Sequence, residues 1–299
     1  MISKQIKLDI NNPVSFLQQI RITIEKGDNL NNEESNYIKK YAHIVKKLPD
    51  EKIKDELIKA LENLDCPSKY FEVLKEHSLL QYILPELSDC INVKSNPYFH
   101  NKDVFGHTMD VLDFTPKNNI KLRLAALFHD LGKPEAFNSS GNNRHDIEGA
   151  RVTNKIMNRM FFDQDMKQSI ISLVQYHMTI FGEITEVDLR RLWNKIGKEN
   201  LLQLIQLKEA DVKSLRIELP SEIEALTRAK EKIKEIEKHG GIISNLDLAV
   251  TEKDLISSGI DSNKSYVLDC LFEGVVYGAF NNEKQELLQK AHKIASYFN

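Results

Sequence analysis

The chain has 299 residues, of which 41% are hydrophobic and 28% charged, and its formal net charge at pH 7 is -3. This composition is typical of a globular protein with a sizeable core, built as one large domain or two or three small ones. The slightly acidic balance excludes a protein whose main role is to coat nucleic acid, although it allows a local basic face. With only 12 glycines and 8 prolines, the chain is expected to be all-α.

Cysteine usage and hydropathy bear on the cell compartment. The three cysteines, Cys66, Cys90 and Cys270, form no C-x-x-C pattern, which favours idle thiols in a reducing cytoplasm. No apolar run approaches the length of a membrane span, and the first ten residues lack the apolar core of a secretion signal. We therefore expect a soluble, cytoplasmic protein with no membrane partner.

Residues 12–85 show the 3.6-residue spacing of about four amphipathic helices. Asn31 or Asn32 can cap the second of these helices, and Asp50 can cap the third. The lysines of this region alternate with acidic residues, which is typical of a solvated helix surface. A weak contact with an RNA backbone is the functional alternative.

The segment from Lys121 to Leu131 is apolar on nearly every side and is expected to be a buried helix that carries His129-Asp130 in its last turn. We expect Gly132 to end this helix and Pro134 to prevent its resumption. A buried carboxylate beside an imidazole is unfavourable unless a partner compensates it. A core hydrogen bond between the two side chains would suffice, and so would a bound cation.

Four more polar residues lie on the apolar side of their own predicted helices, where a polar side chain is unusual. They are His107, His145, His177 and Asp211. A single such histidine is more often a satisfied core residue, but the whole set favours a metal site in a helical bundle. Imidazole nitrogens with carboxylate oxygens suit divalent Mn, Fe, Co, Ni, Zn or Mg.

The order of these motifs resembles the HD superfamily of metal-dependent phosphohydrolases. HNKDVFGHTMDVLD, LRLAALFHDLGKPEAF, RHDIEGA, LVQYH and KEADVKSL are similar to the HD domain of bacterial tRNA nucleotidyltransferases, which include CCA-adding enzymes, and of their poly(A) polymerase relatives. NPVSFLQQIRITIEKG, LPDEKIKDELIKAL and YFEVLKEHSLLQYILPEL resemble the helices that follow the catalytic head in that family. The resemblance implies a neck-like domain at residues 1–88, an HD domain at 89–220 and a helical tail at 221–299.

The resemblance also implies roles for individual residues. It places one divalent ion on His107, His129, Asp130 and Asp211, while His145 and His177 hold a second ion or contact the leaving phosphate. Asp130 and Lys133 are the expected catalytic residues, and Lys133 would also bind a phosphoryl oxygen. Arg144 and Arg151 flank the helix of His145 and, from that position, are further expected phosphate contacts, although surface salt bridges would explain them equally well. His100 and Asp103 suggest supporting contacts around the metal ligands, or a helix cap at Asp103.

Two parts of the family pattern are altered. A nucleotidyltransferase head needs a glycine-rich turn and paired aspartates, but the first glycine is Gly27, and Asp163-Gln164-Asp165 reads as a loop in which Asp165 caps a helix. We therefore expect a neck and HD body without nucleotidyltransferase activity. The family's tail also has a glycine near Asn263, where this chain has none. The sequence therefore does not predict whether the backbone there keeps the conformation that a glycine would adopt.

These observations predict a metal-dependent phosphohydrolase. The expected substrate is a nucleotide or RNA-end phosphoester, such as a 2′,3′-cyclic phosphodiester or a phosphomonoester, because the resembled HD domains act on such groups. One alternative is a non-catalytic module that binds RNA or tRNA, and another is an accessory subunit of a separate head. The sequence does not predict the oligomeric state.

Overall fold

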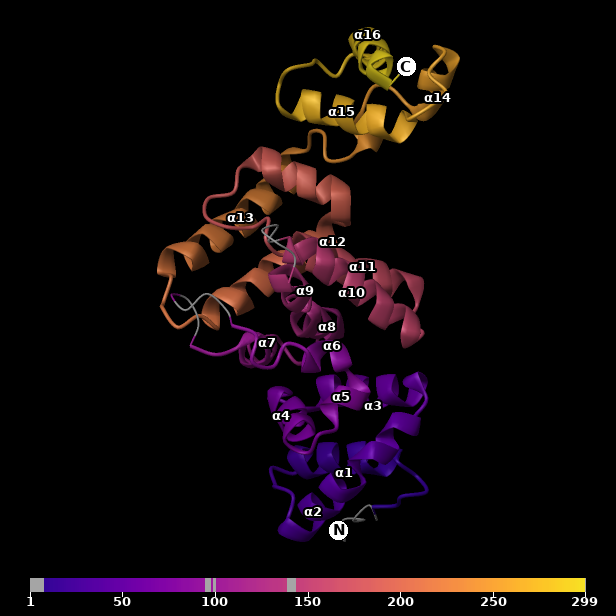
Figure 1. The fold of residues 1–299 in the computed structure, drawn as a ribbon. Helices are drawn as coiled ribbons and strands as arrows, with labels where there is room; N and C mark the ends of the chain where they lie inside the picture. Colours follow the sequence, from indigo (N-terminus) through magenta and orange to yellow (C-terminus); the bar gives the residue numbers. More distant parts are fainter. Residues whose placement is uncertain (1–7, 95–97, 99–100, 139–143, 299) are drawn as a thin grey trace. The chain divides into compact units, whose positions relative to one another are not determined.

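A computed structural model describes residues 8–94, 98, 101–138 and 144–298 of the chain (Figure 1). The described residues fold into helices and contain no strand, apart from an isolated antiparallel bridge between Lys94 and Asp103. The expected all-α fold is confirmed. In the described part of the chain, no helix combines the length and the apolar character needed to cross a membrane.

The chain divides into two compact units. One comprises the described parts of Met1–Ile180 together with Gln203–Pro220, and the other comprises Phe181–Leu202 and Ser221–Asn299. Every residue expected to bind metal or phosphate lies in the first unit. The division into domains at 1–88, 89–220 and 221–299 stays a prediction.

The N-terminal part of the first unit consists of short amphipathic helices. They are α1 (Val14–Glu25), α2 (Asn32–Tyr41), the 3-10 helix η1 (Ala42–Lys47), α3 (Asp50–Asn63), α4 (Ser68–Glu76), α5 (Leu80–Ile83) and α6 (Pro85–Ser88). Asn31 caps α2 in a reciprocal pair with Glu34, as expected. Asp50 is the first helical residue of α3 rather than its cap, because Pro49 occupies the cap position.

The helices that carry the predicted site follow in the same unit. They are α7 (Val104–Asp113), α8 (Ile120–Phe128), α9 (Lys133–Asn138), α10 (His145–Arg159), α11 (Gln164–Tyr176) and the C-terminal part of α12 (Glu186–Lys213). α8 packs against α7, α11 and α3, and α10 packs against α9 and α11. The segment labelled α12 is interrupted at Gly197, whose φ of 78° lies in the region that favours glycine.

The structure corrects three further expectations about helix ends. α8 ends at Phe128 rather than Leu131, so His129 and Asp130 lie in the turn that follows the helix. Pro134 does not stop a helix: it lies in the first turn of α9, where a missing backbone N–H costs nothing. The cap of α11 is Asp163, which accepts a hydrogen bond from the Met166 backbone, and Asp165 lies inside the first turn.

A buried arginine ties α8 to the N-terminal helices. The side chain of Arg123 is 1% exposed and donates to the backbone oxygens of Leu61, Leu64 and Thr115. Leu61 and Leu64 lie at the C-terminal end of α3, where carbonyl oxygens have no partner within the helix. Arg123 therefore satisfies these oxygens and fixes the helix that precedes the site.

The second unit has its own core. Its further elements are α13 (Pro220–His239), η2 (Asn245–Asp247), α14 (Glu252–Ser257), α15 (Lys264–Val276), α16 (Lys284–Ala295) and η3 (Ser296–Phe298). Leu255, Val267, Leu271, Phe272 and Leu287 pack together from α14, α15 and α16. Asn263 has a φ of 54°, so this chain keeps a left-handed conformation without glycine. Asparagine tolerates that conformation better than most residues.

Candidate metal centre

The structure brings the six expected ligand side chains together around Asp130. His107 comes from α7, His129 and Asp130 from the turn after α8, His145 from the start of α10, His177 from the end of α11, and Asp211 from α12. Oδ2 of Asp130 lies 3.3 Å from Nε2 of His129 and 3.5 Å from Nε2 of His107. Its other oxygen, Oδ1, lies 3.7 Å from Nε2 of His145 and 3.8 Å from Nε2 of His177.

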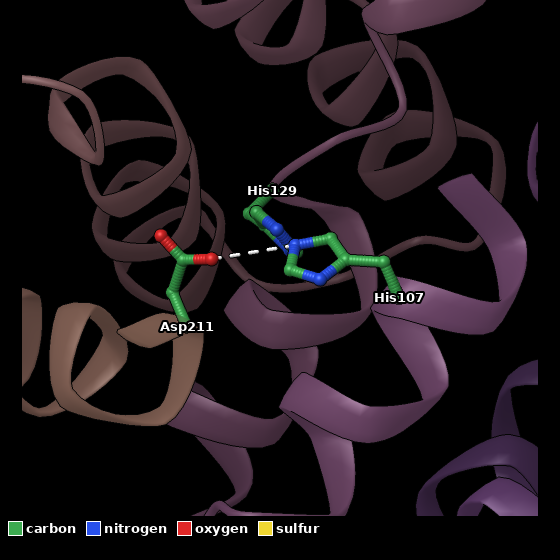
Figure 2. Close-up of side chains that lie close together, drawn as sticks. All are labelled: His107, His129 and Asp211. Carbon is green, nitrogen blue, oxygen red and sulfur yellow. Dashed lines mark ion pairs between the residues drawn. The ribbon is translucent and has the colours of Figure 1, made fainter. Parts of the chain in front are cut away.

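Asp130 thus connects two groups of potential ligands. His107, His129 and Asp211 form one group, and Asp130, His145 and His177 form the other; within each, the ligand atoms lie within 4.8 Å of one another. Figure 2 shows the first group, in which Oδ1 of Asp211 is 3.3 Å from Nε2 of His107. The two oxygens of Asp130 are therefore turned toward different histidines.

Hydrogen bonds to the backbone fix which nitrogen of His129 and of His177 faces the centre. Nδ1 of His129 lies 2.8 Å from the Ala126 carbonyl oxygen, and Nδ1 of His177 lies 2.6 Å from that of Val174. A carbonyl oxygen only accepts, so each Nδ1 carries a proton and donates it. In the neutral imidazole the proton-free Nε2 then turns its lone pair toward Asp130.

Ser214 plays the same role for the ring of His107, by a hydrogen bond to Nδ1. Its hydroxyl donates to the Asp211 backbone oxygen at 2.7 Å, which leaves Oγ to accept from Nδ1 of His107 at 3.1 Å. Neutral His107 therefore also presents the lone pair of Nε2 to the centre. Imidazole lone pairs and carboxylate oxygens facing one another repel unless a cation or proton lies between them.

The donor set fits a divalent cation. Nε2 of His129, both ring nitrogens of His145 and Nε2 of His177 are buried without a hydrogen-bond partner, which is costly for polar atoms. Donor atoms that share one metal at about 2.1 Å lie roughly 3–3.5 Å apart, close to the observed nitrogen–oxygen separations. Mixed nitrogen and oxygen ligands of this kind suit the divalent ions named from the sequence.

Two lysines compensate the carboxylates. Nζ of Lys133 lies 2.5 Å from Oδ2 of Asp130, and Nζ of Lys208 lies 2.8 Å from Oδ2 of Asp211. Burial alone would raise the pKa of Asp130, but the charges of His129 and Lys133 outweigh it and hold that pKa well below the usual value. Burial opposes ionisation of Asp211 as well, and there the contact with His107 and the charge of Lys208 lower the pKa.

The histidines experience two different environments. Burial lowers the pKa of His145, and burial together with the charge of His129 lowers the pKa of His177 to about 3. Both rings are therefore neutral near pH 7, as metal ligands must be. Burial also acts to lower the pKa of His129, but the adjacent negative charge of Asp130 outweighs it and raises that pKa.

Glycines allow α10 to approach the turn that carries Asp130. A Cβ at Gly132 would lie 2.2 Å from the His145 carbonyl oxygen and 2.3 Å from the Gly149 backbone nitrogen. A Cβ at Gly149 would lie 3.3 Å from the His129 carbonyl oxygen. This close backbone approach brings His145 to the centre.

The expected phosphate contacts differ in their positions. Lys133 is 18% exposed and reaches the centre through Asp130. Arg144 is more than half exposed and pairs with Asp146, while Arg151 pairs with Glu148 and Glu135 on the surface. The ion pairs of both arginines are those that a surface salt bridge would make.

Two residues of the centre were missing from the sequence expectations, Lys208 and Ser214. Each lies three positions from Asp211, Lys208 within α12 and Ser214 just after its end, which places them near Asp211 without showing that they contact the centre. Asp103 is the cap of α7, and its side chain accepts a hydrogen bond from the backbone N–H of Gly106. His100 lies outside the described residues.

Comparison with known proteins identifies two domains in the chain. Residues 30–91 match the family described as the probable RNA and SrmB-binding site of polymerase A. Residues 100–215 match the HD domain family. The second match contains all six residues of the candidate metal centre.

Curated relatives that the chain resembles are tRNA nucleotidyltransferases. An A-adding tRNA nucleotidyltransferase from Deinococcus radiodurans is 29% identical over 183 residues, covering 58% of this chain and 41% of the relative. Multifunctional CCA proteins from Janthinobacterium sp. (strain Marseille) and Dechloromonas aromatica are 26% and 32% identical, covering 55% and 44% of this chain. These matches span only 42% and 32% of the two relatives' lengths. The chain thus contains an HD domain and a polymerase-A-type RNA-binding domain, homologous to regions of tRNA nucleotidyltransferases.

Proposed function

We propose that this protein is a metal-dependent phosphohydrolase of the HD type that acts on nucleotide or RNA-end phosphoesters. The observation that carries the proposal is the convergence of four imidazole Nε2 atoms on both oxygens of one buried carboxylate, Asp130. Such a group is unfavourable without a cation, and the HD family match supports a hydrolytic use of one.

His107, His129, Asp130 and Asp211 would hold one ion, and His145 and His177 would hold a second ion together with Asp130. When bound, a divalent ion polarises water and phosphoryl oxygens, which promotes attack at phosphorus. Asp130 would connect the two groups of ligands, since one of its oxygens faces each group. Lys133 would supply positive charge beside Asp130 for a phosphoryl oxygen, and Arg144 and Arg151, which are exposed and paired with carboxylates, would be further phosphate contacts.

The test is a substrate panel run with different metals. Nucleoside 2′,3′-cyclic phosphates, nucleoside monophosphates and RNA oligonucleotides with cyclic or phosphorylated ends would be incubated with Mn, Fe, Co, Ni, Zn or Mg. We expect turnover in the parent chain and a loss of about two orders of magnitude or more in Asp130→Asn. Asp165→Asn, an exposed change of the same chemistry in α11, serves as the control and should keep the parent rate. A parent chain that is inactive with every metal and substrate would end the proposal.

A second candidate is a module that binds RNA or tRNA without hydrolysing it, alone or as an accessory subunit. The match of residues 30–91 to an RNA-binding family favours RNA as a partner in either case. If binding is the whole function, Asp130→Asn should bind tRNA as tightly as the parent while the parent shows no metal-dependent turnover. Measuring tRNA affinity and hydrolysis on the same pair of proteins separates the two candidates.

We also propose that this chain is not a nucleotidyltransferase, although its relatives carry that name. The described residues include no glycine-rich turn followed by paired aspartates, which a triphosphate and its magnesium need. The purified chain should add no nucleotide to tRNA when supplied with ATP, CTP and magnesium. Extension of the tRNA end in a gel assay would refute this proposal.

A further inference from the structure

The two lysines of the metal centre meet their carboxylates in different ways. Nζ of Lys133 contacts Oδ2 of Asp130, the same oxygen that faces Nε2 of His107 and His129. Nζ of Lys208 contacts Oδ2 of Asp211, whereas the other oxygen, Oδ1, faces Nε2 of His107. Lys133 contacts the carboxylate oxygen that faces the histidines. Lys208 contacts the carboxylate oxygen other than the one that faces His107.

This difference predicts different consequences for a cation. A metal bound between Asp130 Oδ2 and the two histidines would compete with the ammonium group of Lys133 for the same oxygen lone pairs. A metal bound to Asp211 Oδ1 would leave the contact of Lys208 intact. Lys208 would then hold the carboxylate in its orientation, as partners of metal ligands commonly do.

From this geometry we infer that Lys133 is a resident counter-ion that a metal displaces from Asp130, whereas Lys208 is a positioning residue that keeps Asp211 aimed at the metal. The inference rests on the proposed function, because it requires a metal at this centre. It adds that loading the metal releases the Lys133 ammonium. The released group is then available to a phosphoryl oxygen of the substrate.

Burial supports both assignments. The side chains of Lys133 and Lys208 are 18% and 10% exposed, and those of Asp130 and Asp211 are 2% and 16% exposed. Charges this far from water interact strongly. Both pairs have an i, i+3 spacing in sequence, so the sequence separation does not distinguish them. The carboxylate oxygen that each lysine contacts does distinguish them.

The test measures Mn²⁺ affinity by isothermal titration calorimetry on chelator-treated full chain. Lys133→Met should bind Mn²⁺ about tenfold more tightly than the parent, because a competing charge-assisted hydrogen bond has been removed. Lys208→Met should bind it about tenfold more weakly, as expected when an orienting partner is lost. Lys213→Met, an exposed lysine of the same helix, should match the parent.

Thermal unfolding supplies a second measurement. Metal-free Lys133→Met should have a lower Tm than the metal-free parent, since Asp130 loses a partner, and saturating Mn²⁺ should raise its Tm by more than it raises that of the parent. If either methionine variant fails to fold by circular dichroism, the glutamine variant at that position takes its place. Shifts of affinity in the same direction at both lysines, or no shift at either, would overturn the inference. A parent that binds no Mn²⁺ would instead overturn the proposed function.

Discussion

The backbone around Gly132 shows how single residues determine the geometry of the candidate metal centre. Gly132 follows the turn that carries Asp130, and the start of α10 lies directly against it, so that His145 reaches the same point. Gly132 does not lie among the glycines with a positive φ. Its requirement is therefore one of space rather than of backbone conformation.

Replacing Gly132 by alanine should destabilise the protein by about 3 kcal/mol or more, because the new Cβ meets backbone atoms that cannot move aside independently. Urea unfolding of parent and variant measures this loss. Gly278→Ala is the control, since it has a φ of 72° and open space around it. It should lose only about 1–2 kcal/mol through backbone strain. Equal losses in the two variants would show that the contact with α10 is unimportant.

The types and spacing of the ligand residues were sufficient to predict their convergence. His107, His145, His177 and Asp211 each continue an apolar helix face, and so many inward polar groups favour a shared partner. Lys208 and Ser214 were not predictable in the same way. Their roles depend on the rotamers they adopt and on which helix packs against α12, and neither follows from spacing alone.

At the scale of elements, a buried ion pair connects α1 to α3. Arg21 donates to Glu56 at 3.0 Å, and Lys59 contacts the other oxygen of Glu56 at 2.8 Å. The Glu56 side chain is 1% exposed. Burial alone would raise its pKa, but hydrogen bonds and charges from Lys59 and Arg21 outweigh this effect and lower the pKa below its ordinary value of 4.5.

Glu56→Gln should reduce the free energy of unfolding at pH 7 by roughly 2–3 kcal/mol. This is less than the ~3–5 kcal/mol typical of a broken buried pair, because Arg21 retains Glu25. The lowered pKa of Glu56 means that its contribution is complete above about pH 4.5 and is lost as the pH falls through the folded-state value. Chemical denaturation at several pH values should therefore show the difference between parent and variant shrinking below pH 4.5. A difference that stays constant down to pH 3 would contradict this assignment.

Helix ends were the least predictable elements, and each miss has a physical reason. The apolar pattern continues through Leu131, but the backbone leaves the helix after Phe128, and periodicity does not register that change. Proline was expected to block a helix, yet in the first turn of α9 its fixed φ and missing N–H are favourable. The buried faces of the same helices were predicted well because apolar spacing reports burial directly.

At the scale of the whole molecule, the first unit joins an RNA-binding-type domain to an HD domain. Arg123 connects them, since it lies in α8 just before the metal centre and holds the C-terminal end of α3. In the proposed function, the domain at residues 30–91 binds the RNA and the HD domain hydrolyses a phosphoester at its end. The centre between α7, α8, α10, α11 and α12 is therefore the feature on which the account depends.

Anomalous diffraction from crystals of the full chain soaked in Mn²⁺ tests that centre most directly. The account predicts a manganese peak among His107, His129, Asp130 and Asp211, and a second peak beside His145 and His177 at higher Mn²⁺ concentration. Both peaks should be absent from crystals of Asp130→Asn. Manganese bound elsewhere on the chain, with none at these six side chains, would contradict the account.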